Sequence, residues 1–142
     1  MTPLRSLLPS LLLTLALAGC AAPAEEYNSF IRSADARDGV YSFSVPLTDS
    51  LATYDFSFYG RLFSGRQSNV ELRVLWLSPS GESFSETVYM RGLDSRGGEE
   101  LYRSGVRLSE AGEWKVNVRP VGVGSEFAGL GLICTKEADG TR

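Results

Sequence analysis

The sequence predicts an all-β fold, an antiparallel β-sandwich of jelly-roll or immunoglobulin-like form with about seven strands. Three observations point to this class. From about residue 40 onward apolar and polar residues alternate with a period of two, no stretch keeps a helical period over a useful length, and Gly, Ser, Asp and Pro separate the alternating segments. A small barrel is the alternative arrangement of the same strands.

The first three predicted strands lie in the first half of the chain. One runs over 41–47, where Pro46 cannot donate to a ladder and therefore ends the strand or lies along a sheet edge. The second covers 54–58. The third covers 70–77, and its last residues, including Leu75, are apolar on both faces. This change predicts a central strand that is covered on both sides at one end.

Four more strands complete the predicted sandwich. Residues 78–81 contain the Pro and Gly of a tight turn. After it, alternation predicts strands over 84–90, 101–108, 114–118 and 127–134. Glu86 interrupts the apolar face of the first of these. Trp76 and Trp114 lie on apolar faces, so we expect both indoles in the core.

The N-terminus carries the pattern of an exported bacterial lipoprotein. Leu17-Ala18-Gly19-Cys20 matches a lipobox and follows a leucine-rich, uncharged run. This run of about 14 residues is shorter than the roughly 20 that a spanning helix needs. We therefore predict a signal peptide over 1–19, cleavage between Gly19 and Cys20, and attachment of a diacylglycerol to the Cys20 thiol.

The remaining residues divide into three predicted parts. We expect a lipidated N-terminus and tether over 20–38, one β-sandwich domain over 39–136 and a C-terminal tail over 137–142. Apolar residues over 27–31 could instead pack on the domain as a short strand. The lipid would hold the protein at the cell envelope. Ala21 after the cysteine, in place of a retention aspartate, favours the outer membrane, with its periplasmic and surface faces both open.

Composition argues against several function classes. The chain has 14 basic and 17 acidic residues and no histidine. A weakly acidic chain without a basic cluster lacks the electrostatic footprint of nucleic-acid binding. The missing histidine excludes Ser-His-Asp and Cys-His nucleophilic sites, and the acids are too scattered for a preorganised calcium loop. We expect no catalytic residue, no metal and no cofactor.

Two smaller features predict packing. Cys134 lies in an apolar run, where a thiol behaves as a small buried hydrophobe. The pairs Gly122-Val123-Gly124 and Gly129-Leu130-Gly131 are too isolated for a phosphate-binding loop. They predict turns and close approach of neighbouring chain.

Tyr59, Tyr89 and Tyr102 form the predicted binding face. All three fall on positions that we expect to point outward, where tyrosine can stack on a sugar or contact a protein. Tyrosine is also an ordinary strand residue, so packing without a ligand is the alternative. Residues 91–100 are polar and glycine-rich. We expect them to form the longest loop and a second place where a partner could bind.

A series of short motifs follows a fixed order between about residues 27 and 134. They are Phe43-x-Val45-x3-Asp49, Tyr54, Arg61, Asn69-x2-Leu72, Trp76, Pro79-x-Gly81, Gly112-x-Trp114-x-Val116-x-Val118 and 127–133. With the lipobox, this order resembles the gliding-motility lipoprotein H (GldH) family of Bacteroidota. The tryptophan that this family shows shortly before the first core strand is missing here.

The resemblance implies a non-catalytic, lipid-anchored component of the cell envelope, associated with gliding and its secretion machinery. It carries no catalytic residue to transfer to this chain. From the residues themselves, we expect a binding or assembly protein that is held to the membrane by its lipid and meets an envelope partner protein. The alternative is a carbohydrate-binding sandwich in which one of the three tyrosines stacks on the sugar.

Overall fold

The computed structural model describes residues 24–137. In this part of the chain the elements are, in order, β1 (Ala24–Arg32), the short 3-10 helix η1 (Ser33–Asp35), β2 (Tyr41–Leu47), β3 (Thr53–Leu62), β4 (Gln67–Leu77), β5 (Ser83–Leu93), β6 (Gly98–Arg107), β7 (Gly112–Val121) and β8 (Phe127–Glu137). The lipobox, with Gly19 and Cys20, lies outside the described residues.

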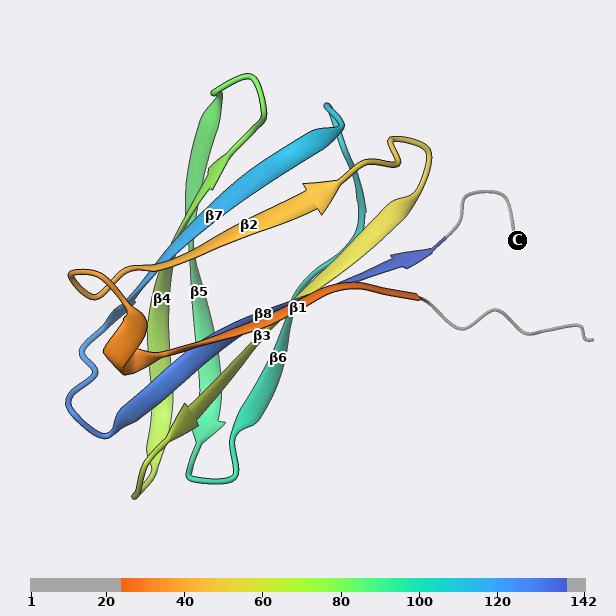
Figure 1. Cartoon of the computed structure of the whole chain (residues 1–142). Helices are drawn as coiled ribbons and strands as arrows, with labels where there is room; N and C mark the ends of the chain where they lie inside the picture. Colours follow the sequence, from red (N-terminus) through yellow and green to blue (C-terminus); the bar gives the residue numbers. More distant parts are fainter. Residues whose placement is uncertain (1–23, 138–142) are drawn as a thin grey trace, which may run out of the picture.

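The strands form two antiparallel four-stranded sheets packed face to face (Figure 1). One sheet has the order β1-β8-β3-β6 and the other has the order β2-β7-β4-β5. The predicted β-sandwich is therefore confirmed. Among the described strands, only β4 and β5 are both consecutive in the chain and neighbours in a sheet. Every other connection crosses from one sheet to the other, so most strand pairing joins distant parts of the sequence.

The sandwich begins before the predicted boundary at residue 39. Ala24–Arg32 form β1, which pairs with β8 from Ala24 opposite Lys136 to Arg32 opposite Gly129. The tether predicted over 20–38 is thus wrong for these residues, and the alternative of a strand over 27–31 is the one observed. The reason is that β8 has a buried inner face and lies between β1 and β3, which both pair with its backbone.

The core fills the space between the two inner faces. The alternation of β2 is complete, with every second residue from Tyr41 to Leu47 buried. Residues with no exposed surface come from both sheets: Val45, Phe58, Leu72, Val116, Leu130 and Cys134. The predicted burial of Cys134, Trp76 and Trp114 is confirmed. Such an interior removes most of the apolar side chains from water, which is the main stabilising term for a domain of this size.

Pro46 lies on an edge strand. Of the two predicted alternatives, a strand end or a sheet edge, the sheet edge is the one observed. It is opposite Glu113 of β7, and β2 has no sheet neighbour on its other side. The third predicted strand, β4, lies between β7 and β5 and is central as expected. Its outer face is open, however, because no layer formed by residues 24–137 covers this sheet, and Leu75 is 37% exposed. The prediction that both faces of β4 are covered at one end of the strand is wrong.

The predicted long loop over 91–100 is a short turn. β5 continues to Leu93 and β6 begins at Gly98, so the connection between these two strands consists of 94–97 only. The backbone oxygen of Asp94 accepts a hydrogen bond from the Leu62 amide at 3.0 Å, and its side chain accepts one from the Arg96 amide at 2.8 Å. The polar and glycine residues of 94–97 form an ordered turn between two long strands.

Trp114 offers a test of the inter-sheet core. Its side chain is 7% exposed, and its Nε1 donates to the backbone oxygen of Glu110 at 3.0 Å. Removing a buried aromatic side chain leaves a cavity, so we expect Trp114→Ala to lower the free energy of unfolding by about 3–5 kcal/mol in urea denaturation. Lys115→Ala, one position along and exposed, should stay close to the parent protein. Similar stability of both variants would contradict this packing.

Candidate binding site

The structure separates the three tyrosines of the predicted binding face. Tyr59 lies on the outer face of the β1-β8-β3-β6 sheet, and Tyr89 lies on the outer face of the other sheet, where it is 54% exposed. Tyr102 is half-buried and packs against the core, so its predicted outward position is wrong. The three residues therefore belong to three different surroundings and cannot contact one ligand together.

Regular alternation along β6 places Tyr102 on the inner face with Gly98 and Glu100, whereas Leu101 is 59% exposed. A β-bulge follows at Tyr102. Ser57 is opposite Leu101, whereas the next partner pair along β6 is Phe56 and Arg103, so Tyr102 is the extra residue. A bulge of this kind shifts the side-chain alternation of its strand. A second register shift follows towards Tyr54, close to Gly105, whose backbone has φ +65°. Because the apolar Leu101 lies on the exposed face and the phase changes after Tyr102, the weak alternation over 101–108 in the sequence predicts the wrong face for Tyr102.

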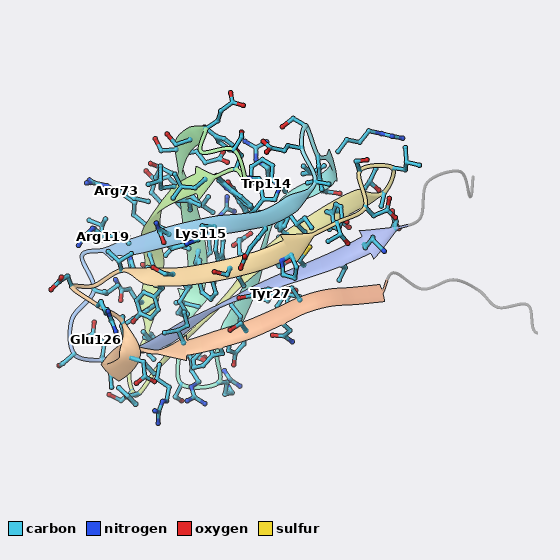
Figure 2. The ribbon with its side chains drawn as sticks, turned by 45° about the horizontal axis from the view of Figure 1, so that its top comes forward. Tyr27, Arg73, Trp114, Lys115, Arg119 and Glu126 are labelled. Atoms are coloured by element: carbon cyan, nitrogen blue, oxygen red, sulfur yellow. The ribbon has the colours of Figure 1, made fainter. Side chains whose placement is uncertain are left out.

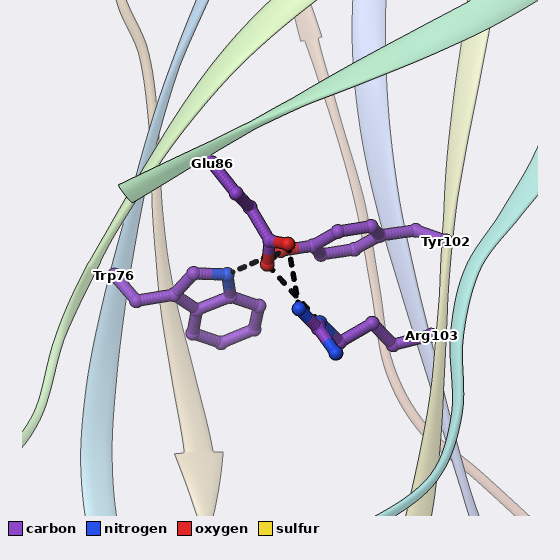
Figure 3. A network of polar contacts seen from close by, with 4 residues as sticks. All are labelled: Trp76, Glu86, Tyr102 and Arg103. Carbon is purple, nitrogen blue, oxygen red and sulfur yellow. Dashed lines mark hydrogen bonds and ion pairs between the residues drawn. The ribbon is translucent and has the colours of Figure 1, made fainter. Parts of the chain in front are cut away.

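Tyr102 belongs to a polar network that joins the edge strands of the two sheets (Figure 3). Its hydroxyl accepts a hydrogen bond from Trp76 Nε1 at 2.9 Å and donates one to Glu86. Arg103 donates to the same carboxylate from Nη2 at 2.6 Å and from Nε at 3.1 Å. Glu86 belongs to β5, and Tyr102 and Arg103 belong to β6. The network therefore links the two sheets along the side of the sandwich formed by the edge strands β5 and β6.

The acidic groups of the network each keep one protonation state near neutral pH. The Arg103 guanidinium lowers the pKa of the Glu86 carboxyl, and the Tyr102 hydroxyl lowers it further. Burial, followed by the bond to Glu86, raises the pKa of Tyr102 to about 12. At neutral pH Glu86 is thus ionised and Tyr102 is protonated. An arrangement of this kind supplies a charged structural bond and no group poised to exchange a proton near pH 7.

A small apolar cavity of about 150 Å³ adjoins the network. Its lining includes Leu47, Phe56, Trp76, Phe84, Val106, Leu108 and Trp114. Phe84 stacks on Trp76 with ring centroids 6.0 Å apart, and half of its surface remains exposed. Ligand pockets usually measure about 300–1,000 Å³. This cavity is therefore large enough for one small apolar group only.

A more extensive candidate site lies on the outer face of the β1-β8-β3-β6 sheet. Phe30, Tyr59 and Arg61, named here the Phe30–Tyr59 cluster, come from β1 and β3. The two rings meet edge to face at 5.9 Å, and the Arg61 guanidinium lies 5.9 Å from the Phe30 centroid. Together with Asn28, Gly131 and Ile133 they line an open hollow of about 420 Å³. The cluster thus combines apolar rings with a cation on an accessible surface.

Two glycines of β8 leave space for the Phe30 ring to lie directly on the sheet. A Cβ atom on Gly129 would come within 2.5 Å of the ring and 2.6 Å of the Ile31 backbone oxygen. A Cβ on Gly131 would lie 3.3 Å from the same ring. The predicted close packing at Gly129-Leu130-Gly131 is confirmed. The sequence interpretation missed this cluster because it placed Phe30 in the tether. The sequence contains both Phe30 and the Gly129-Leu130-Gly131 pair, but nothing in it shows that the two segments are neighbours.

The outer face of the other sheet carries basic residues. Arg73 of β4 and Arg119 of β7 are opposite each other, and Lys115 lies further along β7 (Figure 2). Like charges in opposite positions are destabilising unless other groups offset them. Here Arg73 Nε lies 3.0 Å from Glu71, and Arg119 Nη1 donates to the Asp38 backbone oxygen at 2.9 Å. These contacts offset the repulsion, and the face is more polar than the Phe30–Tyr59 cluster.

No known protein family matches the chain, and no curated protein matches it. Within residues 24–137, no three His, Cys, Asp or Glu side chains gather where they could hold a metal ion. The same residues contain no helix with the length and apolar character needed to cross a bilayer. A hollow of about 580 Å³ on the outer face of the β2-β7-β4-β5 sheet, lined by Arg73, Arg119 and Asn117 among others, is larger than the hollow at the Phe30–Tyr59 cluster. The Phe30–Tyr59 cluster differs from it by combining two aromatic rings with an arginine.

The Glu86 network predicts a specific pH dependence. Because folding lowers the pKa of Glu86, its contribution is complete above the ordinary carboxyl pKa of 4.5 and is lost as the pH falls through the lowered value. We expect Glu86→Gln to destabilise the protein at pH 7 and to flatten the acid limb of unfolding free energy against pH. Tyr102 adds stability that is present below pH 10 and is lost as the pH rises through about 12.

Glu71→Gln is the matched control, because Glu71 pairs with Arg73 on the solvent-exposed outer face. An exposed pair of this kind contributes at most about 1 kcal/mol. Urea titrations of the three proteins between acid and neutral pH would compare them. An unchanged acid limb in Glu86→Gln would show that the network does not join the sheets in solution.

Proposed function

We propose that this protein is a non-catalytic lipoprotein of the bacterial cell envelope that binds an envelope partner protein. In this proposal a diacylglycerol on Cys20 holds the sandwich at the outer membrane. The lipobox and the residue that follows it support the anchor and its location. The single structural observation behind the binding role is the exposed Phe30–Tyr59 cluster on the outer face of the β1-β8-β3-β6 sheet.

The chemistry of the cluster suits a protein partner. Aromatic residues and arginine are enriched in the centres of protein interfaces, where they contribute most of the binding energy. The Phe30 ring is already ordered by the glycines of β8, so binding loses little side-chain freedom. β1 is also an edge strand. A partner strand could add to its open backbone groups beside the cluster.

The order of the sequence motifs supports a role resembling that of gliding-motility lipoprotein H, as an assembly component beside a gliding or secretion machine. Phe43 and Val45 lie on β2, and Trp114, Val116 and Val118 lie on its partner strand β7. They belong to the core, so the family resemblance concerns the scaffold and leaves the binding surface to this chain's own residues.

Carbohydrate binding is the alternative function that the same cluster favours. Tyr59 offers a ring for stacking, and Asn28 and Arg61 line the same shallow hollow with polar groups. Sugars bind to such combinations through apolar ring faces and hydroxyl hydrogen bonds. Tyr89 and Tyr102 do not contribute, because they lie elsewhere. If sugar is the ligand, the site therefore depends on Tyr59 and Phe30.

The anchor is tested by Cys20→Ala. Without the thiol the chain cannot accept diacylglycerol, so we expect loss of metabolic fatty-acid labelling and of membrane fractionation. The thermal unfolding of the purified protein should stay the same, since Cys20 precedes β1. Cys134→Ala is the matched control and should keep both the label and the membrane location. Retention of the Cys20→Ala protein in washed membranes would contradict the lipobox interpretation.

The binding surface is tested by Phe30→Ala and Tyr59→Ala. Truncating a central interface residue typically costs at least about 2 kcal/mol, or roughly thirtyfold in Kd. We expect cross-linking and co-purification of an envelope partner to fall in both variants. Tyr89→Ala changes a more exposed ring on the opposite sheet and should leave capture intact.

A glycan array probed with the same variants separates the two functions. Array binding that is lost in Tyr59→Ala, without a protein partner, would favour the sugar-binding alternative. If Tyr89→Ala alone abolishes capture, the interface lies on the other sheet and the assignment of the Phe30–Tyr59 cluster is wrong.

A further inference from the structure

We propose that one end of the sandwich rests on the phospholipid bilayer, with the Leu51 side chain inserted at the boundary between headgroups and acyl chains. This end, named here the anchor end, consists of the start of β1, the end of β8 and the β2–β3 loop (48–52). The inference depends on the proposed lipid at Cys20. It adds an orientation and a membrane contact that a lipid anchor alone does not imply.

The strand register brings these three segments together. Ala24 at the start of β1 is opposite Lys136, and Thr53 at the start of β3 is opposite Glu137. Both partners lie at the end of β8. Figure 1 shows the β2–β3 loop, the start of β1 and the end of β8 on the same side of the molecule. The anchor end is thus a continuous part of the surface.

The length of chain before β1 keeps this end close to the lipid. Cys20 and Ala24 are four residues apart, and four residues span at most about 14 Å when fully extended. β3 has ten residues, which at about 3.3 Å each extend roughly 30 Å across the sandwich. The attachment is therefore shorter than the domain. It holds the anchor end near the bilayer and keeps the opposite end away from it.

Leu51 is the most exposed of the large apolar side chains in the described part of the chain, at 69%. Its exposure does not come from a loose loop. The Leu51 amide donates to Asp49 Oδ1 at 2.9 Å, and the hydroxyl of the buried Tyr54 bonds to both backbone groups of Asp49. The loop is therefore fixed with Leu51 pointing out, an arrangement that a bilayer would make favourable.

The anchor end carries Glu25, Glu26 and Glu137 on its strands, whereas the charge of the β2–β3 loop itself is balanced. Lys136 Nζ lies 3.7 Å from Asp49 Oδ2, so the one carboxylate within the β2–β3 loop has a cation beside it. A lysine near the surface also attracts anionic headgroups, by about 1 kcal/mol per residue. The loop can therefore approach the membrane without a net local repulsion from Asp49.

The opposite end supplies a matched reference position. Phe63 follows β3, and its amide donates to the Glu126 backbone oxygen at 2.7 Å. It is 64% exposed, close to the value for Leu51. The two residues are thus similar in size and exposure but lie at opposite ends of β3. If hydrophobicity alone decided membrane contact, both would insert; the orientation that we propose allows only Leu51 to do so.

The test uses the full acylated protein in vesicles of phosphatidylethanolamine and phosphatidylglycerol. Leu51→Cys and Phe63→Cys are each labelled with an environment-sensitive fluorophore; the remaining described cysteine, Cys134, is fully buried. Nitroxide lipids, labelled near the top of the acyl chain, serve as quenchers. We expect a blue shift and strong quenching at position 51, and neither effect at position 63. A Leu51→Ser variant should keep its lipid and its vesicle association but lose protection of the loop from protease.

The outcomes separate this inference from the anchor itself. If the protein is acylated and floats with the vesicles, yet position 51 stays unquenched, the orientation is wrong while the anchor stands. Equal quenching at both positions would also overturn it, because the sandwich would then have no preferred end. If the protein carries no lipid and stays in solution, the proposed anchor has failed, and the orientation fails with it.

Discussion

The Trp76 indole joins five strands of the sandwich through its own ring contacts. It lies on β4, and its aromatic neighbours come from β3, β5, β6 and β7, with centroid distances of 5.1 Å to Phe56, 6.0 Å to Phe84, 6.3 Å to Tyr102 and 6.1 Å to Trp114. Because nearly all connections cross between the sheets, local hairpins contribute little to this fold. Side-chain packing between the sheets therefore has to hold the two layers together, and the Trp76 contacts form one part of that packing.

The four edges of the sheets differ in how open they are to another chain. β2 carries Pro46, which cannot donate to a partner strand, and β6 contains the bulges around Tyr102. The Glu86–Arg103 ion pair joins β5 to β6 across their shared side. β1 has neither a proline nor an ion pair to another edge among its described contacts, and its register is regular from Tyr27 to Arg32. This edge borders the Phe30–Tyr59 cluster, which strengthens the case for binding there.

Much of the fold could be predicted because β2, β4 and β7 alternate clearly enough to mark their own buried faces. That alternation predicts Trp76 and Trp114 in the core, and the apolar run before Cys134 predicts its burial. The candidate site could not be predicted in the same way. The face of Tyr102 depends on the register of β6 against β3, in which the apolar Leu101 points outward, and the place of Phe30 depends on β1 pairing with the distant β8. Alternation within one segment carries no information about either partner, so the site appears only when the strands are paired.

The pairing of β1 with β8 also changes what a lipid anchor would mean for this domain. A flexible tether over 20–38 would let the sandwich rotate freely above the bilayer and would leave every surface equally available. Because the strand already begins at Ala24, the same anchor limits both height and orientation. The Phe30–Tyr59 cluster lies on β1 and β3, whose axes run from the anchor end to the opposite end. In that orientation the cluster stands on a side wall of the sandwich, where a partner in the envelope can reach it without displacing the lipid.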